Sequence, residues 1–323
     1  MKKHHSAAAA ALALTLTLSL PAAAQERVTL KSAASSSSYY VMIVQIGEAL
    51  KAASDGKIQP TVEESQGSVQ NVKEAGKRPG NFVFTSPPNL LADARSGKKP
   101  FEGESGYDRI RTLFVMPPIT VHFVVRADSG ITDIAQLEGK DFIGGGKGTF
   151  CEGRTRAILK ALDLEGKVNT VDVELASADN AVRNRKVVGY ATCSSHPTPG
   201  VTELATHTPL RILSFTPQQL ETVLSLDPAS GPVTIAGDTY KGMDGDVQTV
   251  GVPVGGFTTT AMDDETAYQI TKIFWSKRDE MAGKNPWWKA IAPDQVNLLG
   301  TAVHPGALRY YKEAGVTIGE ALQ

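Results

Sequence analysis

Apolar positions along the chain follow two spacings that alternate. Short apolar runs at 28–30 and 58–63 are typical of strands, whereas apolar residues in 42–53 recur every three to four positions, as on one buried helix face. Another strand pattern at 81–85 precedes a helix after Pro88, since proline suits a first helical turn. This strand and helix order predicts an α/β fold with a mostly parallel sheet and helices on both faces.

Two longer β patterns divide the chain. The segment 112–126 is strand-like twice, with an interruption at Pro117 and Pro118, and a second strong β run covers 247–254. Between them the alternation restarts, and after removal of a leader about 300 residues remain, more than one core usually serves. The sequence therefore predicts two lobes joined by two hinge crossings. The expected boundaries are 25–122 plus 253–323 for lobe 1 and 123–252 for lobe 2.

Within lobe 2 the same kind of pattern predicts several elements. The strands are expected at 141–144, 170–174 and 187–193, and the helices at 156–162 and from 178 onward. A later helix in lobe 1 is expected over 267–281. A ligand held between two such lobes stabilises their closed form because it contacts both.

The first 24 residues have the pattern of a secretory signal peptide. Lys2 and Lys3 precede an uncharged stretch at 7–20, and a small-residue cleavage site follows at 22–24. An uncleaved anchor is the alternative, but the apolar run is shorter than a spanning helix needs. We therefore expect a periplasmic protein whose mature chain begins at Gln25.

Composition excludes several classes of function. The formal net charge of −1 becomes −3 when the two leader lysines are removed, so the chain has no basic footprint for nucleic acid. The six histidines are scattered, two of them in the leader, which gives no metal-site pattern. The two cysteines, Cys151 and Cys193, could form one disulfide in an exported protein or remain as two buried thiols.

Two loops of lobe 1 follow predicted strands and open predicted helices, which places them at the ligand edge of the sheet. In the first loop, serine hydroxyls and helix N–H groups could hold an anion while two tyrosines form an aromatic wall. In the second, glycine permits a tight turn and serine begins a helix whose N-terminus attracts carboxylate. The simpler alternative is that these serines only cap their helices. The candidates are Ser37, Ser38, Tyr39, Tyr40, Gly67 and Ser68.

Two further loops offer similar groups. Thr85 and Ser86 place two hydroxyls beside a helix start, and the glycine-rich loop 144–149 of lobe 2 brings Gly148 and Thr149 close to a ligand. That loop lacks a lysine directly before Ser or Thr, as a phosphate-binding P-loop requires, and it does not match the dinucleotide fingerprint. No cofactor is therefore expected.

Four more residues complete the candidate site. Arg154 could make a bidentate contact with a carboxylate, although surface arginines are usually just solvated. Ser195 and His196 end a predicted strand on the same side as Cys151. A Cys or Ser beside His196 satisfies the residue types of nucleophilic catalysis, but no orienting carboxylate or nucleophile elbow accompanies them. We therefore expect a binding protein and not a hydrolase.

An ordered set of segments resembles the TAXI family, the substrate-binding proteins of one class of TRAP transporters. The segments lie in sequence order over essentially the whole mature chain. They are SYY at 38–40, ESQGSVQN at 64–71, VHFVVRADSGI at 121–131, LEGK at 137–140, the glycine loop to Thr149, HP at 196–197, GDTY at 237–240 and HPGALRYY at 304–311.

This resemblance implies a type II periplasmic-binding-protein fold and a ligand that is a small carboxylate, such as glutamate or another organic acid or amino acid. It also implies a partnership with the membrane permease subunits of a TRAP transporter, in which a monomeric receptor delivers its solute. A receptor for an ABC importer or for a sensor kinase would share the fold. The sequence leaves these partners open.

Overall fold

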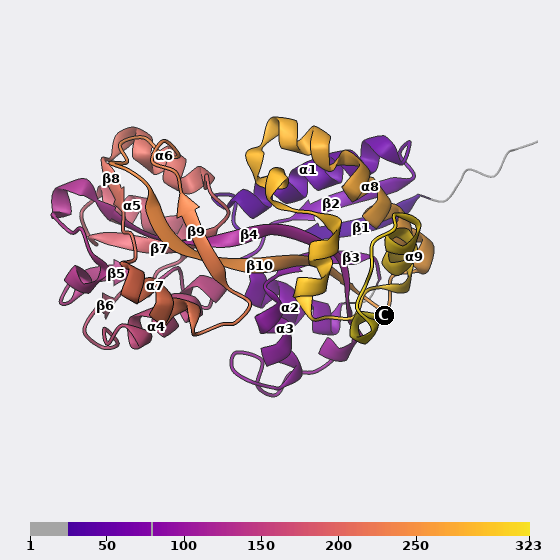
Figure 1. Ribbon diagram of the computed structural model, residues 1–323, viewed down its shortest axis with the longest axis horizontal. Helices are drawn as coiled ribbons and strands as arrows, with labels where there is room; N and C mark the ends of the chain where they lie inside the picture. Colours follow the sequence, from indigo (N-terminus) through magenta and orange to yellow (C-terminus); the bar gives the residue numbers. More distant parts are fainter. Residues whose placement is uncertain (1–24, 79) are drawn as a thin grey trace, which may run out of the picture.

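The computed structural model describes residues 25–78 and 80–323, so the predicted signal peptide lies outside the described residues. Two groups of elements stand side by side, and two long strands run through both (Figure 1). Within the described ranges no helix is long and apolar enough to span a bilayer.

The first group contains the N-terminal and C-terminal elements. Helices α1 and α8 lie on one side of its strands, and α2 and α3 lie on the other (Figure 1). Its elements are β1 (Glu26–Lys31), α1 (Ser38–Ala53), β2 (Ile58–Glu63), α2 (Ser68–Lys77), β3 (Phe82–Ser86), α3 (Pro88–Arg95), α8 (Asp264–Lys284) and α9 (Pro305–Glu313). The sequence patterns therefore placed most of these elements within a few residues.

The second group is formed by the middle of the chain. Its elements are β5 (Asp141–Ile143), α4 (Phe150–Ala161), β6 (Asn169–Thr170), α5 (Ala178–Arg183), β7 (Gly189–Ser194), α6 (Pro199–His207), β8 (Leu210–Ile212), α7 (Pro217–Leu224) and β9 (Gly231–Ile235). The strand expected at 170–174 was mostly wrong, because only Asn169 and Thr170 pair with β5. The sequence patterns gave no bounds for α7, β9 or α9, which are short and only partly buried.

Two long strands connect the groups. Strand β4 (Ile110–Arg126) and strand β10 (Val247–Thr259) pair antiparallel, so a single mixed sheet runs in the order β2-β1-β3-β10-β4-β7-β5-β6. The β1–β2, β1–β3, β5–β6 and β5–β7 pairs are parallel, as expected for an α/β fold. The crossing strands add the antiparallel pairs.

The interruption expected at Pro117 and Pro118 was wrong, because β4 is one continuous strand. The ladder between β4 and β10 instead shifts its register there, between Val252 and Val254. Proline has no N–H to donate, so it is tolerated in a sheet at such irregularities. Both crossing strands are therefore irregular at the same level of the sheet.

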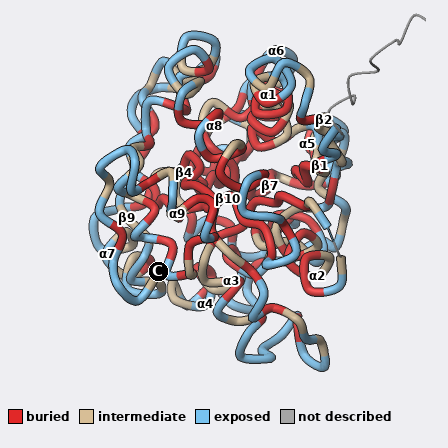
Figure 2. Tube along the Cα trace, turned by 90° about the vertical axis from the view of Figure 1, so that its right-hand side faces the viewer, coloured by how far each residue is buried: buried red, intermediate tan, exposed pale blue. Residues whose placement is uncertain are grey.

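Buried residues form separate cores on the two sides of this level. One core draws its residues from 28–119 and 252–318, and two smaller cores draw theirs from 121–250. Figure 2 shows the buried backbone concentrated along β4, β7 and β10, with exposed segments around it. The boundary between the cores therefore lies close to the register shift between β4 and β10.

Candidate functional site

A cavity of about 70 Å³ lies between the two groups of elements. Its wall contains residues of both groups and no Asp, Glu, Lys, Arg or His. The first group contributes Ser32, Ala33, Ala34, Ser36, Ser37, Tyr39, Gln66, Gly67, Ser68, Thr85, Ile119 and Val254, and the second contributes Gly145, Thr149, Phe150, Cys151, Leu175, Thr192 and Cys193. Hydroxyls and backbone dipoles therefore determine its electrostatics.

The N-terminus of α1 meets the end of β7 beside this cavity. Ser37 caps the helix by accepting a hydrogen bond from the Tyr39 backbone N–H. The Ser194 hydroxyl lies 2.9 Å from the Ser37 hydroxyl and 2.6 Å from the Ser38 hydroxyl, and it accepts from the Ser38 N–H. Ser37 and Ser38 thus join the two groups directly, and their hydroxyls are already engaged.

Tyr39 is anchored at the irregular level of β4. Its hydroxyl donates to the Pro117 carbonyl at 2.5 Å, and its oxygen lies 3.5 Å from the Ser195 hydroxyl. Burial raises the pKa of the Tyr39 phenol far above its usual range, so the group stays neutral. The ring lines the cavity, whereas Tyr40 is not part of the lining.

The N-terminus of α2 presents free donors. Gly67 precedes the helix with φ 113° and ψ −163°, a conformation almost restricted to glycine, and it offers no side-chain cap. Within the described residues the Ser68 and Val69 N–H groups have no hydrogen-bond partner. Such groups at a helix N-terminus favour an anion.

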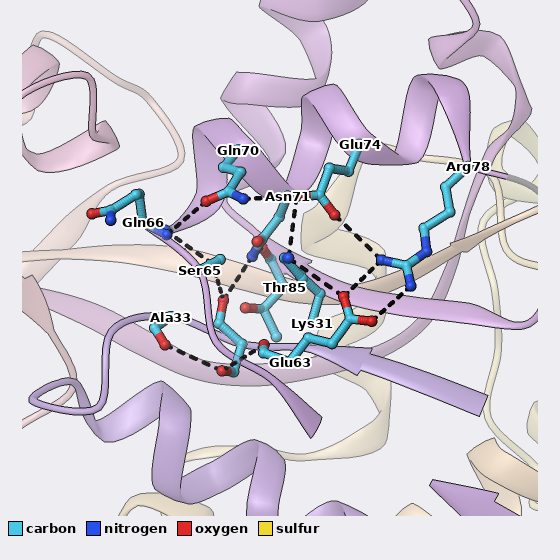
Figure 3. A network of polar contacts seen from close by, with 12 residues as sticks. Lys31, Ala33, Glu63, Ser65, Gln66, Gln70, Asn71, Glu74, Arg78 and Thr85 are labelled. Carbon is cyan, nitrogen blue, oxygen red and sulfur yellow. Dashed lines mark hydrogen bonds and ion pairs between the residues drawn. The ribbon is translucent and has the colours of Figure 1, made fainter. Parts of the chain in front are cut away.

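A network of polar contacts holds the segment before α2 (Figure 3). The Ser65 hydroxyl donates to the Ser32 carbonyl at 2.8 Å and accepts from the Gly67 N–H at 3.0 Å. Gln66 donates its N–H to the Gln70 side chain at 2.8 Å. The fully buried Asn71 amide donates to the Ser32 and Thr85 carbonyls. The turn therefore has a fixed position relative to β1 and β3.

Ion pairs extend the same network away from the cavity (Figure 3). Arg78 binds both carboxylate oxygens of Glu63 at 2.7 Å, and the buried Lys31 lies 3.1 Å from Glu74. The Arg78 hydrogen bonds lower the pKa of Glu63. These charges neutralise one another, so they leave the cavity itself uncharged.

The opposite wall is the glycine loop and the start of α4. The Thr149 hydroxyl accepts from the Glu152 N–H and lies 2.8 Å from the Gly145 and Gly146 carbonyls. It therefore closes the loop and is not free to donate to a ligand. The next two N–H groups, of Phe150 and Cys151, have no partner in the described part of the chain.

Cys151 and Cys193 form a disulfide with 5.4 Å between their Cα atoms. It joins the first turn of α4 to β7, and both residues line the cavity. A Cβ added at Gly145, where φ is 110°, would lie 2.7 Å from the Cys151 Cβ. The glycine therefore lets the loop pack directly against the disulfide.

The candidate catalytic groups are not arranged for nucleophilic attack. Cys151 is bonded to Cys193 and has no free thiol. His196 Nδ1 lies 2.8 Å from the Thr120 hydroxyl, and Ser195 donates to the Pro118 carbonyl at 2.7 Å. Burial lowers the pKa of His196. Within the described residues no group of three or more His, Cys, Asp or Glu side chains could hold a metal ion.

The structure brings half of the predicted site residues to the cavity wall. These are Ser37, Tyr39, Gly67, Ser68, Thr85, Thr149 and Cys151. The others lie outside the wall: Ser38, Tyr40, Ser86, Gly148, Arg154, Ser195 and His196. Ser86 donates to the adjacent Pro87 carbonyl, while Gly148 and Arg154 line a separate groove.

Sequence reasoning missed several lining residues, notably Gln66, Ile119, Phe150, Leu175 and Thr192. Gln66 and Phe150 are direct neighbours of predicted residues, so a wider reading of the same loops would have found them. Leu175 and Thr192 carry no local signal, because only the tertiary fold brings them to the cavity.

Solved structures share this architecture at low sequence identity. The periplasmic binding protein BugD matches with a TM-score of 0.58 and 14% identity over 91% of this chain and 99% of that one. A structure described as a periplasmic transporter matches with a TM-score of 0.52 and 12% identity, covering 90% and 92% of the two chains. A protein from Bordetella bronchiseptica RB50 gives 0.50 and 15%, covering 91% and 83%. The fold is that of a periplasmic binding protein.

The family follows from the sequence itself. Residues 30–315 match the model of the NMT1-like family. This range covers both groups of elements, the crossing strands and the cavity. The chain belongs to the NMT1-like family.

Proposed function

We propose that the chain is a periplasmic solute-binding protein of the TAXI type that captures a small organic anion and delivers it to a TRAP membrane permease. One observation carries this proposal. Backbone N–H groups without a partner in the described chain stand at the starts of α2 and α4, one helix in each group of elements. Of the residues that carry them, Ser68, Phe150 and Cys151 line one uncharged cavity, and Val69 follows Ser68 directly.

The cavity suits an anion for a physical reason. A helix N-terminus carries about half a positive charge, and the peptide N–H groups there are already oriented. Among its lining residues the cavity has no carboxylate that would repel an anion. Ser68 also lines the cavity, and its hydroxyl adds a further donor.

We propose that residues 25–122 with 253–323 and residues 123–252 move as two lobes about β4 and β10. The change of core and the irregular ladder at Pro117 and Pro118 support this division. In the closed arrangement, lobe 1 contributes the α2 N-terminus and lobe 2 contributes the α4 N-terminus. Solute binding would therefore favour closure, because only the closed form contacts the anion from both sides.

The side chains that could act as nucleophiles are already bonded to other groups. This supports the proposal that the chain is a receptor and not an enzyme. Cys151 is in a disulfide, and Ser195 and His196 bond to other groups. A receptor should release its solute unchanged. A chemically altered solute after incubation would contradict the proposal.

The first experiment is native mass spectrometry of protein isolated from the periplasm, followed by a thermal-shift screen of small carboxylates. A ligand that binds only the folded state at 100 times its Kd stabilises the protein by about 2.7 kcal/mol. We expect a bound organic acid, a rise in Tm and a mature chain that begins at Gln25. A protein whose Tm responds to no carboxylate would exclude an anionic solute.

Ser68→Ala tests the placement of the solute. Leaving one buried polar group of the solute unpaired should weaken binding by about 1–3 kcal/mol. Ser96→Ala is the matched control, because the Ser96 hydroxyl bonds only to the Ala92 carbonyl at the exposed end of α3. Equal affinity of both variants for the solute would contradict the placement.

The partner is tested by crosslinking the loaded receptor in membranes. Recovery of TRAP permease subunits, increased by solute, is expected. Recovery of an ABC importer or of a sensor kinase would contradict the TRAP assignment while leaving the binding function in place.

A further inference from the structure

One segment of the proposed lobe 2, residues 194–200, makes a series of hydrogen bonds to the proposed lobe 1. This contact segment begins at the last residue of β7 and ends in the first turn of α6. The bonds join Ser194 to Ser37 and Ser38, Ser195 to the Pro118 carbonyl, the Pro197 carbonyl to Trp287 Nε1, and the Gly200 N–H to the Ser36 carbonyl. The shape of the contact segment therefore decides how the two lobes fit together.

A turn inside the contact segment is closed by Thr198, the N-cap residue of α6. The Thr198 hydroxyl donates to the Ser195 carbonyl at 3.1 Å. The Thr198 N–H donates to the hydroxyl of Tyr240 at 2.8 Å. Thr198 is 2% exposed and Tyr240 is 5% exposed, so this bond is shielded from water. Tyr240 therefore holds the turn from within lobe 2.

Tyr240 is held in turn by His122. The Tyr240 hydroxyl lies 3.0 Å from His122 Nε2, and His122 Nδ1 lies 3.0 Å from the Thr120 carbonyl. Burial lowers the pKa of His122 to about 3, so the ring is neutral and carries one N–H. A carbonyl can only accept, so this N–H is at Nδ1, and Nε2 accepts from the Tyr240 hydroxyl. The Tyr240 hydroxyl thus donates to one buried group and accepts from another.

We propose that Tyr240 is a positioning residue for lobe closure, which fixes Thr198 and thereby the contact segment in the form that fits lobe 1. This inference rests on the proposed function, because it assumes that the lobes close on a solute. Tyr240 is not among the residues that line the cavity of about 70 Å³. It would therefore act through the contact segment and not by touching the solute.

Loss of the Tyr240 hydroxyl would cost more in the closed form than in the open form. Without the hydroxyl, the Thr198 N–H and His122 Nε2 are both buried without a partner, which is costly. In the closed form lobe 1 holds the contact segment in place, whereas after opening the segment can shift and Thr198 can reach water. The hydroxyl therefore favours closure. By linkage, closure must strengthen the bond between Thr198 and Tyr240 by the same free energy.

The first measurement compares the unaltered protein with Tyr240→Phe. The probes are linear mono- and dicarboxylates of two to six carbons and L-glutamate. Calorimetry gives the Kd, and stopped-flow mixing gives the dissociation rate, of the probe that the unaltered protein binds most tightly. We expect Tyr240→Phe to raise the Kd about tenfold. The change should come almost entirely from faster dissociation, because the lobes must open before the solute leaves.

Tyr311→Phe is the matched control. The Tyr311 hydroxyl is also buried, accepts from Trp275 Nε1 at 3.1 Å and donates to the Leu113 carbonyl at 3.0 Å, but all three residues lie in lobe 1. This variant should lower the Tm by a similar amount and leave the Kd and the dissociation rate unchanged. An equal rise in Kd for both variants would show that general destabilisation weakens binding, and would overturn the positioning role.

Amide exchange tests the inference in the unaltered protein, so that it does not depend on the folding of a variant. Residues 197 and 199 are prolines, so Thr198 carries the one backbone N–H between His196 and Gly200, and mass spectrometry can follow it in a short peptide. Saturation with the same probe should slow exchange at Thr198 at least tenfold, because closure strengthens its hydrogen bond.

The possible outcomes separate the two proposals. Unchanged exchange at Thr198 on binding, or an unchanged dissociation rate in Tyr240→Phe, would overturn the role of Tyr240 while the receptor function stands. Failure of every probe to bind would contradict the proposed function and, with it, the inference that rests on it.

Discussion

The Gly200 backbone N–H donates to the Ser36 carbonyl at 3.0 Å, so the first turn of α6 contacts the loop before α1. A Cβ added at Gly200 would lie 3.2 Å from the Ser36 Cβ and 3.3 Å from the Ser36 carbonyl oxygen. Under the proposed movement of two lobes, this close approach would belong to their closed arrangement. A larger side chain at Gly200 would hold them apart.

Gly200→Leu should therefore weaken solute binding at least tenfold while changing the Tm of the solute-free protein by little, because opening of the lobes relieves the clash. Binding is measured by calorimetry and closure by small-angle scattering. Gly283→Leu in α8 is the control, since a Cβ there meets no atom within 4 Å. Unchanged affinity of Gly200→Leu would show that closure does not need this contact.

The backbone at Gly67 predicts a second effect. Gly67→Ala should reduce the free energy of unfolding by about 1–3 kcal/mol, because φ 113° with ψ −163° is strained for any residue with a Cβ. Gly153→Ala, inside α4 with open space around it, should instead stabilise by about 0.5–1 kcal/mol. Denaturant titrations measure both. A neutral Gly67→Ala would contradict the strained turn.

The disulfide should contribute strongly to stability. Replacing Cys151 and Cys193 by Ala should lower the free energy of unfolding by about 4 kcal/mol in the loop-entropy model, for a separation of 42 residues. Solute affinity should also fall, because the bond fixes the α4 N-terminus against β7. Denaturation with and without reductant provides the control, since only the unaltered protein should respond. Two titratable thiols in the unreduced protein would contradict the bond.

His122 predicts a pH dependence of stability. It is fully buried between the Thr120 carbonyl and the Tyr240 hydroxyl, each 3.0 Å from a ring nitrogen. Burial lowers the pKa of His122 to about 3, below the value of about 6.5 in an unfolded chain. The unfolded state therefore binds the extra proton between these two pH values, and acidification favours unfolding.

The unaltered protein should lose up to about 1.4 kcal/mol of His122-dependent stability per pH unit as the pH falls from 6.5 toward 3. Denaturant unfolding between pH 7 and 5 measures this slope above the range where carboxylates titrate. His122→Gln should be less stable at pH 7 but have a shallower slope. Equal slopes would indicate that other buried histidines, such as His196, dominate.

Local patterns predicted much of the fold. The 3.6-residue spacing over 42–53 identified α1, the apolar run at 58–63 matched β2, and Pro88 marked the start of α3. These patterns succeed because one face of each element must be buried, and the residues on one face recur at a fixed spacing in a helix or a strand. Short, partly buried elements such as β9 contain too few residues for such a spacing to stand out.

The loops of the site were predictable as a group but not in their detailed roles. Gly67 and Ser68 follow from the rule that ligands bind at the carboxyl ends of strands, and both line the cavity. Thr149 was expected to lie close to a ligand and it lines the cavity, yet its hydroxyl is engaged by the glycine loop. Which partner a hydroxyl takes depends on atoms brought near by folding.

The sequence by itself determined the α/β alternation, the two crossing segments and the loops rich in Ser and Gly, because each depends on residues close together in the chain. Only the tertiary structure decided that Ser194 bonds to Ser37 and Ser38, that Cys151 bonds to Cys193, and that Arg154 is buried without a partner for its Nε. These relationships depend on how β7 and α4 pack against β4. Such long-range packing is fixed by the sum of many weak contacts and not by any local pattern.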